Sequence, residues 1–97
     1  MPTYVALGKW TQHGIRNIKD LDKRFEDAKK IVKSFRGEVK IVYFTMGQYD
    51  WVSVMEFPND NAAMSALLKF GSGGSARTET LKAFAVEETM EFVKKIL

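Results

Sequence analysis

Hydrophobic and polar residues alternate with a period of two in four stretches of the chain, which predicts four β-strands. The stretches are Thr3 to Trp10, Glu38 to Thr45, Trp51 to Phe57 and, approximately, Arg77 to Ala85. Apolar residues stand at both odd and even positions of the first three. The predicted strands therefore have two largely apolar faces instead of one.

Apolar residues spaced three and four apart predict a long amphipathic helix between the first two strands. They are Ile15, Ile18, Leu21, Phe25, Ala28, Val32 and Phe35. Thr11 is the expected N-cap, and the polar segment 19–22 is expected to divide the helix into a short and a longer piece, with Asp20 or Asp22 capping the second. Gly37 is expected to end it.

Two further helices are expected in the second half of the chain. Asn59 or Asp60 should cap a helix that reaches Phe70, and a helix should run from Glu87 to Leu97. The order of elements is then β-α-β-β-α-β followed by a helix. This order predicts one α+β domain over residues 1–97, with a ferredoxin-like four-stranded antiparallel sheet and two helices on one face.

The second face of that sheet has no predicted cover from the two crossover helices. We assign to it Val42, Phe44 and Met46, together with Trp51, Met55 and Phe57 or their alternates on the same strand. Such a surface would exceed the apolar patch that monomers tolerate. A second copy of the chain is therefore the expected partner, the alternative being that the terminal helix folds over the face.

Composition narrows the class of protein but identifies no reaction. The 97 residues include no cysteine, so disulfides, thiolate metal sites and cysteine nucleophiles are excluded. No run of apolar residues is long enough to span a membrane, no signal peptide is predicted, and the expected location is the cytoplasm. The net charge of +3 is spread over helix surfaces without clustered stacking aromatics, so neither nucleic acid nor membrane is an expected partner.

The segment between the second and third strands holds the most distinctive polar residues. Residues 46–50 form the predicted turn, in which Gly47 supplies conformational freedom. Tyr49 and Asp50 either bind or protonate a small polar ligand at the mouth of a pocket, or they only stabilise the turn. Both readings are open from the sequence.

Other polar residues give weaker indications. His13, the only histidine, is a candidate general base or a solvated loop residue, and no metal site is predicted within the chain. Arg77 could meet an anionic ligand or pair with Glu79. The glycine-rich run at residues 71–75 lacks the Lys-Ser/Thr pair of a phosphate-binding loop, and it leads into a strand.

Several of these segments resemble one known family. Gly47-Gln48-Tyr49-Asp50 is similar to the motif of the GYD domain family, as are the opening Tyr4-Val5-Ala6-Leu7 and the stretch from Arg77 to Phe84. The resemblance implies a dimeric α+β barrel, in which the sheets of two small subunits pack face to face. Proteins of that fold include monooxygenases, isomerases, haem-degrading proteins and ligand-sensing domains, so the resemblance implies no particular activity.

The expected function is that of a homo-oligomeric subunit with a small-molecule pocket near Trp10, Tyr49, Asp50 and Arg77, without a cofactor. One alternative is an enzyme, cofactor-free or haem-using, in which Tyr49, Asp50 or His13 acts as acid or base. The other is a purely structural assembly module.

Overall fold

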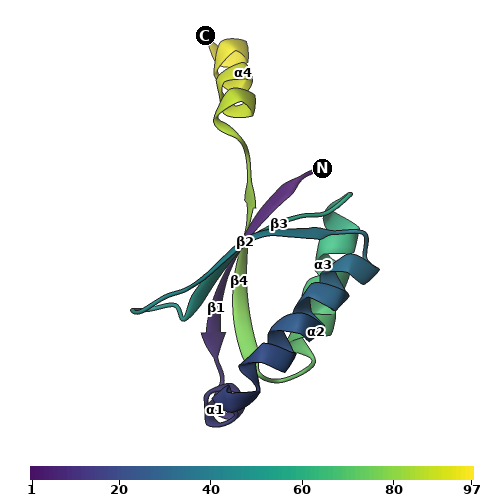
Figure 1. Ribbon diagram of the computed structural model, residues 1–97. Coiled ribbons are helices and arrows are strands. Elements are labelled where there is room, and N and C mark those ends of the chain that lie inside the picture. Colours follow the sequence, from purple (N-terminus) through teal and green to yellow (C-terminus); the bar gives the residue numbers. More distant parts are fainter.

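The computed structural model describes all 97 residues, and its elements follow the predicted order (Figure 1). They are β1 (Thr3–Trp10), α1 (Gln12–Arg16), the short 3₁₀ helix η1 (Ile18–Asp20), α2 (Leu21–Ser34), β2 (Glu38–Phe44), β3 (Trp51–Glu56), α3 (Asp60–Gly71), β4 (Ala76–Ala83) and α4 (Val86–Ile96). None of these helices has the length and apolar character needed to cross a membrane.

The four strands form one antiparallel sheet in the order β2-β3-β1-β4. In Figure 1, α2 and α3 lie side by side on one face of this sheet. This arrangement confirms the predicted ferredoxin-like α+β fold. It leaves β1 and β3 in the centre, and β2 and β4 at the edges.

Two of the predicted helix N-caps, Thr11 and Asn59, are confirmed. The side chain of Thr11 accepts a hydrogen bond from the Gly14 N–H, and that of Asn59 accepts one from Ala62. The first helix is divided as expected, but the carboxylate of Asp20, at the N-cap position of α2, makes no capping hydrogen bond.

The end of α2 differs from the prediction. Arg36, not Gly37, adopts the left-handed conformation, with φ of 63°, and the helix ends two residues before it. Gly37 is instead required by space, since a Cβ atom there would lie 2.5 Å from the ring of Phe57. The glycine therefore serves the packing of β3 against the helix layer.

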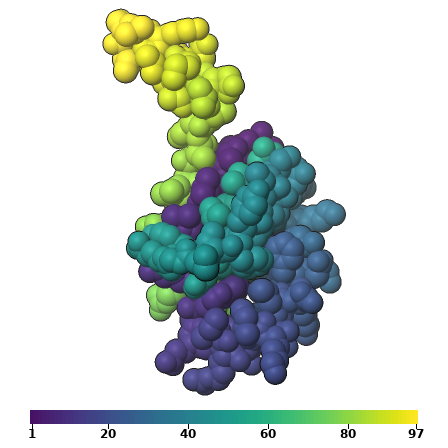
Figure 2. Space-filling model, turned by 60° about the vertical axis from the view of Figure 1, so that its left-hand side comes forward, coloured from purple at the N-terminus to yellow at the C-terminus, as the bar shows by residue number.

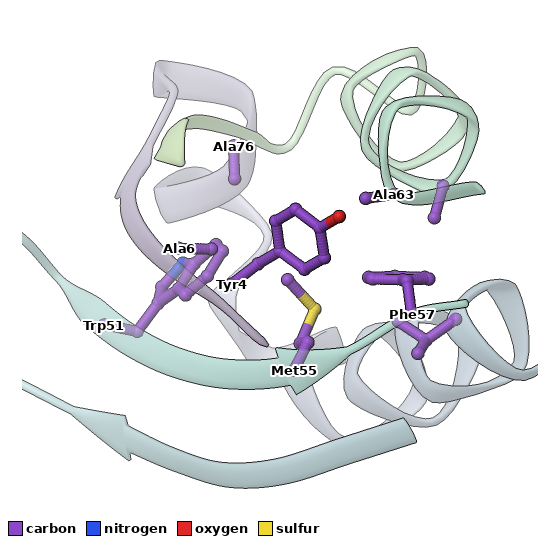
Figure 3. Close-up of a cluster of buried hydrophobic side chains, with 9 residues drawn as sticks. Tyr4, Ala6, Trp51, Met55, Phe57, Ala63 and Ala76 are labelled. Atoms are coloured by element: carbon purple, nitrogen blue, oxygen red, sulfur yellow. The ribbon is translucent and has the colours of Figure 1, made fainter. Parts of the chain in front are cut away.

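The core lies between the helices and the sheet (Figure 3). It contains Tyr4, Ala6, Val32, Trp51, Met55, Phe57, Ala63, Ala66 and Ala76. Even positions of β1 and odd positions of β3 point to this side, as the pleat requires. Phe57 is completely buried and meets the ring of Tyr4 edge-on at 5.8 Å between centroids.

The hydroxyl of Tyr4 links the sheet to the start of α3. It donates a hydrogen bond to the carboxylate of Asp60, which also pairs with Lys82 at 3.0 Å. Burial and this hydrogen bond raise the pKa of Tyr4 to about 12, while the bonds from Tyr4 and Lys82 lower the pKa of Asp60. At neutral pH the phenol therefore stays protonated and the carboxylate stays charged, and the two groups fix the helix layer to the sheet.

The predicted assignment to the helix-free face was wrong for β2, whereas on β3 the alternates Val52 and Val54, and not Trp51, Met55 and Phe57, lie there. Val42 and Phe44 stand opposite Ser53 and Trp51, and all four belong to the helix-covered side. Met46 lies in the loop and is fully exposed. Two-residue alternation separates the faces of a strand but does not say which face receives the helices.

The helix-free face is nevertheless apolar at its centre. The register of the strands gives it Val5, Leu7, Ile41, Tyr43, Val52, Val54 and Leu81. We call these seven residues the open face. Ile41, Tyr43 and Leu81 are 47%, 64% and 51% exposed, respectively. The prediction of an uncovered apolar face is thus confirmed, with the alternate residues of β3 and with Ile41 and Tyr43 in place of Val42 and Phe44 on β2.

The terminal helix does not cover the open face. It stands beyond the end of β4, away from the rest of the domain (Figures 1 and 2). None of its residues is buried, and its only aromatic contact is between Phe92 and the nearby Phe84, at 5.5 Å. Apart from this contact with Phe84, the chain leaves the apolar sides of both α4 and the open face uncovered.

Candidate functional site

A cavity of about 100 Å³ lies between the sheet and the helix layer. Its wall is apolar except for a few donors and hydroxyls, and it contains no carboxylate. The aromatic and polar groups of the wall include Trp10, Arg24, Phe25, Phe44, Trp51 and Ser53. Small ligands generally bind in concave sites of this kind, which are mostly apolar and carry few polar groups.

Aromatic rings from five elements, three strands and two helices, form one side of the cavity. The ring of Trp10 stacks on Phe44 at 6.3 Å between centroids and lies 6.4 Å from Trp51. Phe25 from α2 meets Phe44 edge-on at 6.3 Å, and Phe70 from α3 meets Trp51 at 5.9 Å. The sheet and both helices thus contribute to one aromatic wall.

Small residues of β1 make room for the large ring of Trp51. A Cβ atom at Gly8 would lie 1.9 Å from the indole of Trp51. Gly8 and Trp51 are directly opposite in the register, so the indole lies flat over the glycine. Its Nε1–H is buried and has no hydrogen-bond partner.

Arg24 is the cation of the cavity. Its Nη2 donates to the backbone carbonyls of Gly14 and Asn17, at 3.0 and 3.2 Å. The guanidinium carbon lies 5.2 Å from the ring of Trp10, within the range of a cation–π interaction. Its Nε and Nη1 atoms are buried and make no hydrogen bond.

Arg24 is not among the site residues predicted from the sequence, although its spacing along the helix places it on the apolar face. Arg24 follows Leu21 by three residues and precedes Ala28 by four, so it shares the inner face of the helix with them. A charged residue on an apolar helix face needs a partner or a function. The sequence-based interpretation places the lysines of this segment on a solvated surface and makes no prediction for Arg24.

Asp50 holds the backbone of the loop and of the end of β1 in place beside the cavity. Its Oδ2 accepts a hydrogen bond from the backbone N–H of Trp10 at 2.8 Å. Its own N–H donates to Gly8 at 2.8 Å, and its carbonyl accepts from Thr45 at 2.8 Å. These bonds tie the loop after β2 to the end of β1, and Gly47 supplies the expected positive φ of 116°. They hold Trp10 in the aromatic wall.

Replacing Asp50 by alanine is expected to lower the free energy of unfolding by about 2 kcal/mol, because the Trp10 N–H loses a charged acceptor. Asp50→Asn keeps an acceptor oxygen and should cost less. Urea denaturation measures both, with the exposed Asp27→Asn as a matched control. Full stability of Asp50→Ala would contradict a structural role and favour direct contact with a ligand.

Tyr49 lies apart from the cavity. Its hydroxyl donates to Glu79 at 2.8 Å, and the ammonium of Lys9 lies 5.3 Å from its ring. This hydrogen bond is the main cause of a raised pKa for the Tyr49 phenol, with a smaller effect of burial. The register places Lys9 and Glu79 on the helix-free side of the sheet, so Tyr49 lies at the end of that side.

The remaining predicted residues also lie outside the cavity. Arg77 lines a separate, shallow polar hollow beside the glycine-rich loop and does not pair with Glu79. His13 is exposed on α1, and its Nδ1 lies 3.4 Å from the side chain of Asn17. No three carboxylate or imidazole groups gather as a metal site would require.

The four predicted ligand-binding residues are therefore not brought together around one space. Trp10 lines the cavity, and Asp50 accepts a hydrogen bond from the backbone N–H of Trp10. Tyr49 and Arg77 do not line the cavity. A role of these residues in binding stays a prediction. The structure adds Arg24 and Trp51, two residues of the cavity wall whose side chains hold buried donors without a partner.

Comparisons with known proteins agree with this fold. The sequence profile of the GYD domain matches residues 4–93. A curated protein of Thermus thermophilus, named "Glutamine synthetase and cystathionine beta-lyase binding protein", is 28% identical over 95 residues, which are 97% of this chain and 100% of that protein.

Two crystal structures are similar in fold. FFRP-DM1 has a TM-score of 0.61 at 19% identity, over 87% of this chain and 100% of its own. TTHA0845 from Thermus thermophilus has a TM-score of 0.57 at 22% identity, over 89% of this chain and 96% of its own. At these identities the likeness concerns the fold alone.

Proposed function

The chain belongs to the GYD domain family, and we propose that it works as a homodimeric subunit that binds a small, mostly apolar molecule between its sheet and its helices. The cavity with the aromatic wall carries the proposal of ligand binding. The open face and the charges around it support the proposal of a dimer.

A second copy is the partner that suits the open face best. The seven residues form one apolar surface at the middle of the sheet, and two-fold symmetry would place it against itself. Burying such side chains contributes about 25 cal/mol for each Å² of apolar surface removed from water. Exposed to water, the same surface would invite aggregation.

Charges at the two ends of the helix-free side favour one orientation of the copies. Lys9 stands directly opposite Arg77 at one end, and Glu38 stands directly opposite Glu56 at the other, about 20 Å away along the strands. Like charges across a strand pair repel each other. A second sheet turned end for end would place Lys9 and Arg77 of one copy toward Glu38 and Glu56 of the other. Within one copy, Glu38 also pairs with Lys40 at 3.6 Å, and Glu79 follows Arg77 on the same face.

The ligand-binding proposal rests on a space that the side chains leave between two packed layers. Protein interiors are close-packed and leave few voids larger than a water molecule. This cavity is larger and mostly apolar, and Phe44 in its wall is half exposed. A small molecule that filled it would recover contacts that the side chains do not make with each other.

Two measurements on the intact chain test the proposal. Sedimentation at micromolar concentration should give twice the monomer mass of 11.1 kDa. Small aromatic compounds should raise the melting temperature by mass action. Ala28→Leu, which fills the cavity from α2, should abolish that shift, whereas Ala85→Leu, outside the cavity, should keep it. A stable monomer in sedimentation would overturn the proposed dimer. Equal shifts of the melting temperature in the Ala28→Leu and Ala85→Leu variants would overturn the proposed ligand site.

A second candidate function is the binding of another protein. The Thermus relative is named for its binding of two enzymes, and α4 offers an exposed apolar side that no part of this chain covers. Amphipathic helices of this kind bind in apolar grooves of partner proteins. Loss of partner binding on removal of residues 86–97, with the ligand-induced shift unchanged, would favour this candidate.

A further inference from the structure

We propose that the ligand of the cavity is a small carboxylic acid with an apolar body, bound as its monoanion by Arg24. This inference rests on the proposed binding function and names the chemical class of its ligand. Nothing in the family profile or in the relative's name points to an acid. The buried, unpaired donors of Arg24 and Trp51, two residues of the cavity wall, are the observation that does.

The first observation is the unbalanced charge of Arg24. The chain has four salt bridges, and none of them involves Arg24. No aspartate or glutamate lines the cavity, and the second basic residue of the wall, Lys29, is paired with Glu26 at 3.0 Å. A guanidinium in such apolar surroundings lacks the counter-charge that normally compensates for lost hydration. An anion bound in the cavity would supply it.

The second observation is the set of unused donors. Arg24 satisfies its Nη2 with two carbonyls, which fixes the side chain, but its Nε–H and Nη1–H groups have no acceptor. A purely structural arginine would be expected to use these donors too, because each buried donor without a partner costs about 1–3 kcal/mol. Only acceptors can satisfy them, and a carboxylate forms the strongest such bonds.

The third observation concerns the remainder of the ligand. Trp51, a residue of the wall, has a second buried donor without a partner, its indole N–H, and its ring lies 6.4 Å from that of Trp10, which Arg24 overlies. The other surfaces are aromatic and aliphatic. A cavity of about 100 Å³ admits one aromatic ring or a short chain, as engineered apolar cavities of about 150 Å³ admit benzene. A phosphate or a dicarboxylate would bring more charge than one cation can balance.

Calorimetry with benzoate and benzamide tests the assignment on the wild-type chain. The two probes have the same ring and nearly the same shape, but only benzoate is charged at neutral pH. We expect benzoate to bind at least about tenfold more tightly, since hydrogen bonds to charged groups contribute more than neutral ones. Arg24→Gln should remove this difference. Arg16→Gln, an exposed arginine of α1, is the matched control and should leave it unchanged.

The binding results distinguish the acidic nature of the ligand from the existence of the ligand site. Equal binding of benzoate and benzamide would overturn the acid and leave an apolar ligand site in place. Binding of neither probe, or of any related aromatic compound, would overturn the site itself. If Arg24→Gln does not fold, Arg24→Lys, which keeps the charge but has fewer donors, should show a reduced preference for benzoate; an unchanged preference in that variant would overturn the role of Arg24.

Discussion

Gly14→Ala is expected to destabilise the fold by about 3 kcal/mol, at the upper end of the usual cost of overpacking. An added Cβ atom would lie 1.9 Å from the backbone carbonyl oxygen of Ser75. Backbone cannot rotate aside as a side chain can, so α1 or the loop before β4 must move. Two hydrogen bonds in this contact, from Thr11 to Ser75 and to Gly74, would be strained together.

The same substitution should weaken the ligand site, because the carbonyl of Gly14 accepts one of the two hydrogen bonds that fix Arg24. Gly71→Ala is the matched control: its added Cβ atom meets nothing within 4 Å, and alanine favours the end of α3. Thermal and urea denaturation would measure both. Equal stabilities of the two variants would contradict the contact between α1 and the loop.

Val54→Lys is expected to convert the proposed dimer to monomers at micromolar concentration. Val54 stands between Val5 and Ile41 on the two neighbouring strands, at the centre of the open face. In a two-fold dimer each substitution brings two ammonium groups into one apolar contact. An unpaired buried charge costs several kcal/mol, which is comparable to the free energy of a modest dimer interface.

The control for this variant carries the same charge on the opposite side of the domain. Asn61→Lys adds a lysine to the exposed surface of α3 and should leave the mass in sedimentation unchanged. Circular dichroism would establish that both variants keep their secondary structure. A Val54→Lys chain that stays dimeric would place the contact between copies elsewhere, with α4 as the remaining apolar surface.

Much of the fold could be predicted from the sequence because its periodicities are strong and its caps are local. The strand at residues 3–10, the division of the first helix and the caps at Thr11 and Asn59 follow from residues within a few positions of each other. The residue at the end of α2 could not be predicted in this way. Gly37 is placed by the ring of Phe57, a contact between distant parts of the chain.

The candidate site was harder to predict because its polar residues come from different elements. The turn containing Tyr49 and Asp50 stands out as a motif, yet its hydrogen bonds serve the loop, the end of β1 and Glu79. Arg24 belongs to no motif, and it becomes notable only because the neighbouring rings and the absence of an acid are visible in three dimensions. The periodicity of a sequence does not show which side chains from distant elements contact each other in the fold.

The alternation of side chains along β3 has a consequence for communication through the sheet. Trp51 and Ser53 line the cavity, while Val52 and Val54 belong to the open face. A single backbone thus carries both surfaces, separated by one peptide unit. If occupancy of one surface displaces this strand, the affinity at the other must change, and thermodynamic reciprocity makes the effect equal in both directions. Through this strand, filling of the proposed ligand site would then shift the equilibrium between one copy of the chain and two.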